Sequence, residues 1–82
     1  MPTVLRIGPY RFQFFAADIS EPPHVHVKRD KSHAKFWLSE DVAPSFVRGF
    51  ADHDATYVRK LIVQNREFLL EQWNEFFRGH PR

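Results

Sequence analysis

Two short runs of alternating side chains, joined by a polar turn, constrain the fold of this chain more than any other feature. The first run, residues 24–29, alternates histidine or lysine with valine. It follows Pro22-Pro23, which cannot lie inside a central strand. The second run, residues 33–38, alternates histidine, lysine and tryptophan with alanine, phenylalanine and leucine. Because strand side chains alternate between faces, each run predicts a strand with one apolar and one polar face.

Both patterns agree on one antiparallel register for these two strands. A slip of one residue would place histidine and lysine against valine. The turn falls on Asp30-Lys31, which is not a preferred pair for a two-residue loop, so a four-residue loop around a type I turn is favoured. The predicted pairs are His24 with Trp37, Val25 with Phe36, His26 with Lys35, Val27 with Ala34, and Lys28 with His33.

The remaining sequence completes a single predicted α+β domain over residues 1–82. The pattern of Tyr10, Phe12 and Phe14 indicates another strand with its aromatic side chains inward. A long apolar stripe after Asp52 or Asp54, either of which can cap a helix start, predicts one helix that Gly79 ends. We therefore expect a four- to five-stranded, mainly antiparallel sheet packed by one long C-terminal helix. The expected strands are about 3–7, 10–15, 24–29, 33–38 and, unless that segment only covers the sheet, 45–49, with the helix at about 53–78.

Composition narrows the class of protein. The 82 residues contain no cysteine, which excludes disulfides, thiolate metal sites and a cysteine nucleophile. No apolar run is long enough to span a membrane, and no signal-peptide pattern opens the chain. These features fit a cytoplasmic bacterial protein. The net charge of +2 and a pI near 9.3 permit an anionic partner.

The polar face of the predicted hairpin could carry phosphodiester chemistry on RNA. Histidine titrates near neutral pH and can serve as base or acid, and cations can hold phosphate without a metal or cofactor. We expect His26 to act as the acid or base, because the opposite Lys35 should keep it from staying protonated. The candidate catalytic residues are His24, His26, Lys35 and Glu21. The candidate phosphate- or base-binding residues are Arg6, Arg11, Lys28, His33 and Trp37, whose indole could stack on a base.

Two alternatives use the same face. His24 and His26 have a spacing that a first-row metal accepts, with His33 or Glu21 as the third ligand. The neighbouring lysines oppose a cation, so no metal ligand is assigned. The other alternative is a non-catalytic surface that docks nucleic acid or an acidic protein.

The predicted helix carries a second apolar ridge beside its main stripe. Val63, Leu70 and Phe77 repeat every seven residues, and Phe68 widens the other flank. These side chains are either buried under residues 46–50 or form an interface with a partner protein or a second copy of the chain.

Several blocks of this sequence resemble a small bacterial family, the domain of unknown function 4160 family. They are the segments 2–8 and 10–12, the block Glu21-Pro22-Pro23-His24-Val25-His26-Val27, the segment 34–38, Gly49-Phe50 and the helix end at 73–77. The resemblance implies a toxin–antitoxin-like pair with a small partner from the domain of unknown function 2442 family. One departure is the segment 52–56, where a serine or lysine would be expected at the helix start. The resulting lead function is a toxin-like component that acts on RNA or the translation machinery.

Overall fold

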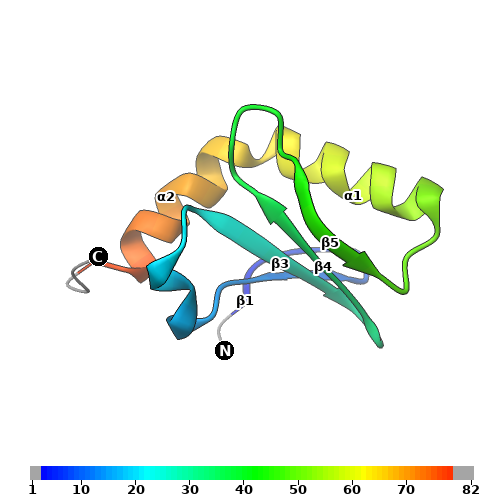
Figure 1. Ribbon diagram of the computed structural model, residues 1–82, viewed down its shortest axis with the longest axis horizontal. Coiled ribbons are helices and arrows are strands. Elements are labelled where there is room, and N and C mark those ends of the chain that lie inside the picture. Colours follow the sequence, from blue (N-terminus) through cyan, green and yellow to red (C-terminus); the bar gives the residue numbers. More distant parts are fainter. Residues whose placement is uncertain (1–2, 79–82) are drawn as a thin grey trace.

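The computed structural model describes residues 3–78 as one antiparallel sheet followed by two helices (Figure 1). Each strand pairs with the next one along the chain, so the sheet order is β1-β2-β3-β4-β5. The strands are β1 (Thr3–Ile7), β2 (Tyr10–Gln13), β3 (His24–Arg29), β4 (Ser32–Trp37) and β5 (Pro44–Arg48). A 3-10 helix, η1 (Ala16–Ser20), joins β2 to β3, and α1 (Asp52–Gln64) and α2 (Arg66–Phe76) follow β5. The α+β class and the fifth strand are as expected.

The register predicted for the central hairpin is confirmed at all five pairs, from His24 opposite Trp37 to Lys28 opposite His33. The turn differs from the prediction. Arg29 pairs with Ser32, so the loop has the two residues Asp30 and Lys31 rather than four. Asp30 takes the left-handed conformation with φ 53°, which aspartate tolerates better than most residues.

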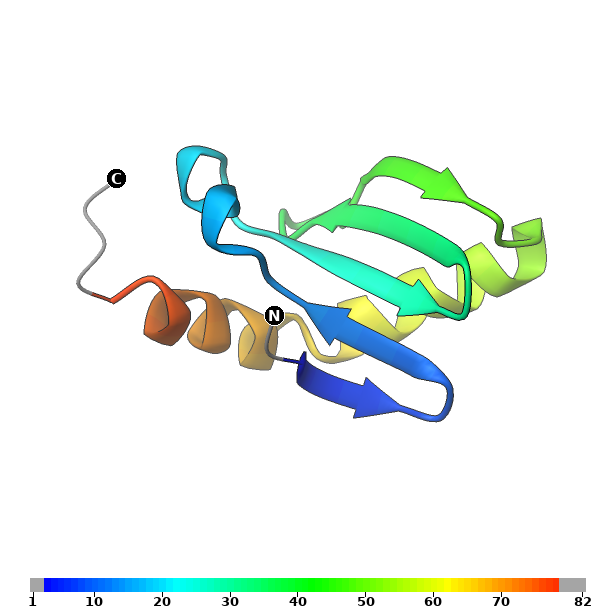
Figure 2. The ribbon, with the colours of Figure 1, turned by 90° about the horizontal axis from the view of Figure 1, so that it is seen from below.

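The hydrophobic core lies between the sheet and the two helices, which cover one face of the strands (Figures 1 and 2). Tyr10, Phe12 and Phe14 are buried there as predicted. The ring of Phe14 contacts Trp73 of α2 edge-on at 5.3 Å between ring centres. Figure 2 shows the opposite face, over which η1 stands at one end.

The single long helix that we expected is interrupted at Asn65. Asn65 has φ −113° and ψ 16°, and its side-chain amide donates a hydrogen bond to the carbonyl of Leu61 at 2.8 Å. A side chain that satisfies a nearby backbone carbonyl offers the chain an alternative to the regular helical ladder. No glycine or proline between residues 52 and 76 marks this break in the sequence.

The helix start also differs from the expectation. The N-cap residue is Ala51, and no side chain caps the helix. Asp52 and Asp54 lie instead in the first turn, where their charge still favours the positive end of the helix dipole. The predicted stop at Gly79 lies outside the described residues. Within residues 3–78, neither helix has the length and apolar character that crossing a membrane requires.

Two arginines connect the β4–β5 loop to the helices through hydrogen bonds. Arg59 of α1 donates hydrogen bonds to the carbonyls of Asp41 and Val42. Arg66 of α2 donates its Nε–H to the carbonyls of Leu38 at 3.1 Å and Ser39 at 2.9 Å. Both side chains therefore satisfy carbonyl groups of the loop that would otherwise depend on water.

Candidate functional site

One row of cations crosses the whole sheet on the face away from the helices. Each member lies directly opposite the next one across a strand pair, and His33 is the only member that is not permanently charged. The row consists of Arg6, Arg11, Lys28, His33 and Arg48, and we call it the cation ladder. With about 4.8 Å between neighbouring strands, the ladder spans about 19 Å.

No carboxylate within residues 3–78 forms an ion pair with the four permanent cations of the ladder. Two of them lie over aromatic rings instead. Lys28 Nζ is 5.0 Å from the ring centre of Phe15, and the Arg48 guanidinium is 4.7 Å from that of Phe46. These contacts hold the cations in place and leave their charge available to an anion.

A buried group of one carboxylate and two imidazoles lies beside the ladder. Asp18 comes from η1, and His24 and His26 come from β3. Oδ1 of Asp18 lies 3.1 Å from Nε2 of His24 and 3.3 Å from Nε2 of His26. We call these three residues the Asp18 cluster. Its three ligand-type atoms all lie within 4.8 Å of one another, so the cluster could hold a metal ion.

Further hydrogen bonds orient each member of the Asp18 cluster. Nδ1 of His24 donates to the carbonyl of Pro22 at 2.9 Å. The Phe15 N–H donates to Asp18 Oδ2 at 2.8 Å. Nδ1 of His26 lies 2.9 Å from Nε2 of His33, which connects the cluster to the ladder. The ring of Phe15 also packs on His26, with 4.2 Å between ring centres.

The surroundings lower the pKa values of Asp18, His26 and His33. Burial alone would raise the pKa of Asp18, but the Phe15 N–H and the imidazoles of His24 and His26 outweigh it, so the pKa is lowered. The pKa of His26 is lowered, with burial as the largest cause, although Asp18 acts to raise it. Burial also lowers the pKa of His33, and the charges of Lys28 and Arg48 add to this effect.

The predicted catalytic residues lie close together but not on an open face. His24 is fully buried, and His26 is 6% exposed, so the expectation that both imidazoles face solvent is wrong. Phe15 and η1 cover the two imidazoles at the start of β3. The ring of His24 also contacts Trp73, with 5.2 Å between ring centres. The catalytic assignment itself stays a prediction.

Lys35 and Glu21 form an ion pair, with Nζ and Oε1 2.5 Å apart. The hydrogen bond from Lys35 lowers the pKa of Glu21. Glu21 also lies near His24 as expected, with 3.7 Å between Oε1 and Nδ1. We expected Lys35 to hold down the pKa of His26, but burial is the main cause of that shift.

Sequence reasoning did not assign Asp18, Phe15 or Phe46 to the site. Asp18 belongs to the segment that joins β2 to β3. The one sequence feature that could have placed it near the histidines is that this segment must lead into β3 at His24. Phe46 lies opposite Lys35 on the ladder face, and its ring meets His33 edge-on at 5.1 Å. Its placement depends on the register of β5, which the sequence left open.

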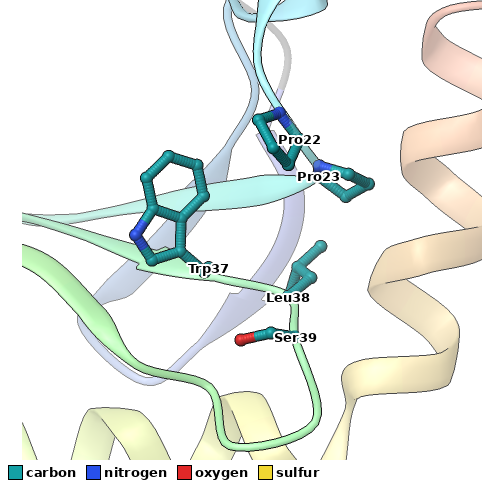
Figure 3. A pocket seen from close by; sticks show the side chains of 5 residues that line it. All are labelled: Pro22, Pro23, Trp37, Leu38 and Ser39. Atoms are coloured by element: carbon teal, nitrogen blue, oxygen red, sulfur yellow. The ribbon is translucent and has the colours of Figure 1, made fainter.

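Trp37 borders an open apolar hollow of about 220 Å³ at the end of the sheet where β3 begins and β4 ends. Figure 3 shows its indole on one side and the rings of Pro22 and Pro23 on another, with Leu38 and Ser39 completing the lining. Lys35 Nζ lies 4.7 Å from the indole ring centre. Because Lys35 lies over one face of the indole, a nucleobase would stack on the other face.

The four residues predicted to form a partner interface separate into two kinds. Val63 and Phe68 are exposed at 46% and 41%. Leu70 is half-buried against the core. Phe77 is 7% exposed and packs on Trp73 at 4.4 Å between ring centres, so its assignment to an interface is wrong.

A family model described as Domain of unknown function (DUF4160) matches residues 10–74. The chain belongs to this family. The match includes β2, η1, the central hairpin and most of α2, and therefore both the Asp18 cluster and most of the cation ladder. No curated protein and no solved structure matches the chain.

Proposed function

We propose that this DUF4160 protein binds RNA through the cation ladder and is the toxin-like component of a bacterial two-protein module in the cytoplasm. The observation that carries the RNA-binding part is the row of four permanent cations across five strands without an acidic partner in residues 3–78. The two-protein setting rests on the resemblance to the family and on the exposed apolar side chains discussed below.

The ladder costs stability in the isolated protein. Like charges directly opposite each other in a sheet destabilise it, and Arg11 has Arg6 on one side and Lys28 on the other. A polyanion that follows the ladder would remove this repulsion and release its own counterions. A span of about 19 Å is sufficient for several phosphates of an extended strand.

Aromatic side chains next to the ladder support a single-stranded ligand. Phe15 and Phe46 lie against ladder residues, and Trp37 borders the apolar hollow two residues along β4 from Lys35. Bases of a single strand can stack on such rings without sequence preference, whereas the bases of a duplex are already stacked. We therefore favour single-stranded RNA over a duplex.

Binding and cleavage are separate parts of the function. His24 is fully buried, so its ring cannot touch a ribose hydroxyl while the described fold is intact. The proposal therefore assigns recognition to the ladder, and cleavage of the bound RNA is measured as its own outcome.

The test measures binding of a labelled single-stranded RNA by fluorescence anisotropy across a range of salt concentrations. Replacing both Arg11 and Lys28 with glutamine should lower affinity at least tenfold and reduce the salt slope by about 1.4, or about 0.7 per lost phosphate contact. Lys60→Gln on α1 is the control for a lost surface charge, and it should bind almost as well as the wild type. An equal loss of affinity per removed charge in the double variant and in Lys60→Gln would show that only net charge matters and would overturn the proposal.

The same variants test the toxin-like role in cells. Induction of the wild type should arrest growth, and the Arg11→Gln/Lys28→Gln protein should not. Gel analysis of the bound RNA then distinguishes a nuclease from a protein that only binds. Normal growth under strong induction of a folded wild-type protein would contradict the toxin-like part of the proposal.

A partner protein is the second part of the proposed module. Val63 and Phe68 lie on either side of the Asn65 break, and both line a hollow formed by residues 63–68. We propose that the small partner resembling the domain of unknown function 2442 family docks there. Tagged protein purified from its own host should retain the partner, and Val63→Ser/Phe68→Ser should lose it while the control Tyr57→Ser keeps it. A stable homodimer in light scattering that the same change dissociates would assign the surface to a second copy instead.

A further inference from the structure

The Asp18 cluster contains an unsatisfied buried nitrogen. Nε2 of His24 is the one buried side-chain nitrogen or oxygen in residues 3–78 that lacks a hydrogen-bond partner. It lies 3.1 Å from Asp18 Oδ1, within ion-pair distance if the ring is protonated, but the two atoms are not aligned as a hydrogen bond requires. An unpaired polar atom in the interior costs free energy comparable to a lost hydrogen bond, so its persistence requires an explanation.

The tautomer of His24 follows from its other nitrogen. A carbonyl oxygen can only accept, so Nδ1, 2.9 Å from the Pro22 carbonyl, must carry the hydrogen. In the neutral ring, Nε2 then presents a lone pair toward the carboxylate of Asp18. Two electron-rich atoms that face each other in a buried site need a positive charge between them, either a proton on the imidazole or a metal ion.

His26 presents the same arrangement from two residues further along β3. Its Nε2 lies 3.2 Å from Asp18 Oδ2, and its Nδ1 lies 2.9 Å from Nε2 of His33. When Nδ1 of His26 donates to His33, a second lone pair points at the carboxylate of Asp18. Three donor atoms then converge from two elements of the fold, η1 and β3.

These distances fit a first-row divalent metal ion. Metal–nitrogen and metal–oxygen bonds of about 2.0–2.1 Å in a tetrahedral site place ligand atoms about 3.3 Å apart. The separations from Asp18 to the two imidazoles are 3.1 to 3.3 Å, and the three ligand atoms all lie within 4.8 Å of one another. Two histidines and one carboxylate form a known ligand set for zinc and for iron, and they leave a further position open.

The hydrogen bonds around the cluster match those that usually support metal ligands. A ligating histidine normally donates its other N–H to a carbonyl, carboxylate or water, as Nδ1 of His24 does to Pro22. The Asp18 carboxylate is itself fixed by the Phe15 N–H at 2.8 Å. The repulsion expected from neighbouring lysines is reduced, because Lys35 is paired with Glu21 at 2.5 Å.

We propose that Asp18, His24 and His26 bind a first-row divalent transition-metal ion through Oδ1, Nε2 and Nε2. The third ligand is thus Asp18, rather than the His33 or Glu21 that the sequence suggested. Mg²⁺, which prefers a shell of oxygens and retains its waters, should not occupy this nitrogen-rich site. The proposal is independent of RNA binding, because the ladder cations are not ligands.

The test titrates chelator-treated full-length protein with Zn²⁺ and, separately, with Mg²⁺ by calorimetry. The wild type should bind one Zn²⁺ per chain, and Zn²⁺ but not Mg²⁺ should raise its melting temperature. Asp18→Asn, which keeps the size of the side chain, should lower Zn²⁺ affinity more than tenfold. His53→Gln, which removes an imidazole that is 85% exposed, should bind as the wild type does.

A measurement on the wild type keeps the test decisive if Asp18→Asn does not fold. Nitrogen-15 spectra of the imidazoles should show Zn²⁺ shifting Nε2 of His24 and His26, with the signals of His53 unchanged. Absence of binding at equimolar Zn²⁺, equal losses in Asp18→Asn and His53→Gln, or a His24 ring that stays doubly protonated at neutral pH with Zn²⁺ present would overturn the proposal.

Discussion

Nδ1 of His26 lies 2.9 Å from Nε2 of His33, so one hydrogen is shared between a buried ring of β3 and a half-buried ring of β4. Protonating both rings would place two hydrogens between these nitrogens. Burial lowers the pKa of both residues from the ordinary value of 6.5, and Lys28 and Arg48 lower that of His33 further. Asp18 opposes the shift in His26 without reversing it.

These lowered pKa values predict that the fold loses stability on acidification. The unfolded chain takes up protons near pH 6.5, whereas the folded chain does so only at a lower pH, so stability falls as the pH drops below 6.5. In the presence of a chelator, the melting temperature should be lower at about pH 5.5 than at about pH 8. His33→Gln should reduce the difference, and His53→Gln should not. A melting temperature that rises toward pH 5.5 would show that the imidazoles are protonated and paired with Asp18.

The hairpin was predictable from the sequence because its register depends on side-chain parity. Only one pairing keeps apolar residues opposite each other on both strands. It places valine opposite alanine or phenylalanine on one face, and histidine opposite lysine or tryptophan on the other. The turn was not predictable in the same way. Asp30 adopts a positive φ, and the strand twist favours a two-residue loop over the longer one that its composition suggests.

The burial of the site could not be predicted by parity. Parity places His24 and His26 on the face opposite the valines, but it does not indicate which segment returns over that face. Asp18 and Phe15 reach it through η1, a non-local contact between a connecting segment and a strand. The helix break at Asn65 could not be predicted either, because asparagine is tolerated within helices. Its side-chain hydrogen bond to the Leu61 carbonyl forms only in the folded chain.

Gly49 should be the most sensitive glycine in the described chain. It has φ +80°, and an added Cβ would lie 2.9 Å from Ser32 Oγ and 3.3 Å from Ser32 Cα. Gly49→Ala should therefore lower the free energy of unfolding by about 1 to 3 kcal/mol. Gly8 also has a positive φ but open space around it, so Gly8→Ala should cost less, about 1 kcal/mol. Urea unfolding of both variants measures the difference, and equal costs would mean that Ser32 yields freely.

Arg66 should contribute to stability although it lies on a helix surface. Its Nε–H is shared between the carbonyls of Leu38 and Ser39, and hydrogen bonds to charged groups are stronger than neutral ones. Arg66→Gln should lower the free energy of unfolding by about 1 to 2 kcal/mol. Lys60→Gln, on an exposed position of α1, should change it by less than about 0.5 kcal/mol. Urea denaturation compares them, and equal effects would indicate that the loop carbonyls accept water instead.

Truncation of Phe77 should destabilise the fold much more than truncation of Phe68. Phe77 is 7% exposed and packs on Trp73 and Phe76, so Phe77→Ala should cost about 3 kcal/mol. Phe68 is 41% exposed, so Phe68→Ala should cost less than about 1 kcal/mol. Thermal and urea unfolding of the isolated protein give both values. A large cost for Phe68→Ala would mean that this side chain stabilises the chain itself and is less available to a partner.

Replacing Arg11 with glutamine should show that repulsion within the cation ladder destabilises the folded protein. Arg6 and Lys28 flank it across β1 and β3, so Arg11→Gln removes two like-charged contacts at once. At low salt, the free energy of unfolding of the variant should be about 0.5 kcal/mol higher than that of the wild type. The variant should also bind single-stranded RNA more weakly. Added salt screens the repulsion, so the stability gap should narrow as the salt concentration rises. If Arg11→Gln is instead less stable at low salt, the packing of the arginine stem on the sheet outweighs the repulsion between charges, and the ladder carries no stored cost that an anion could relieve.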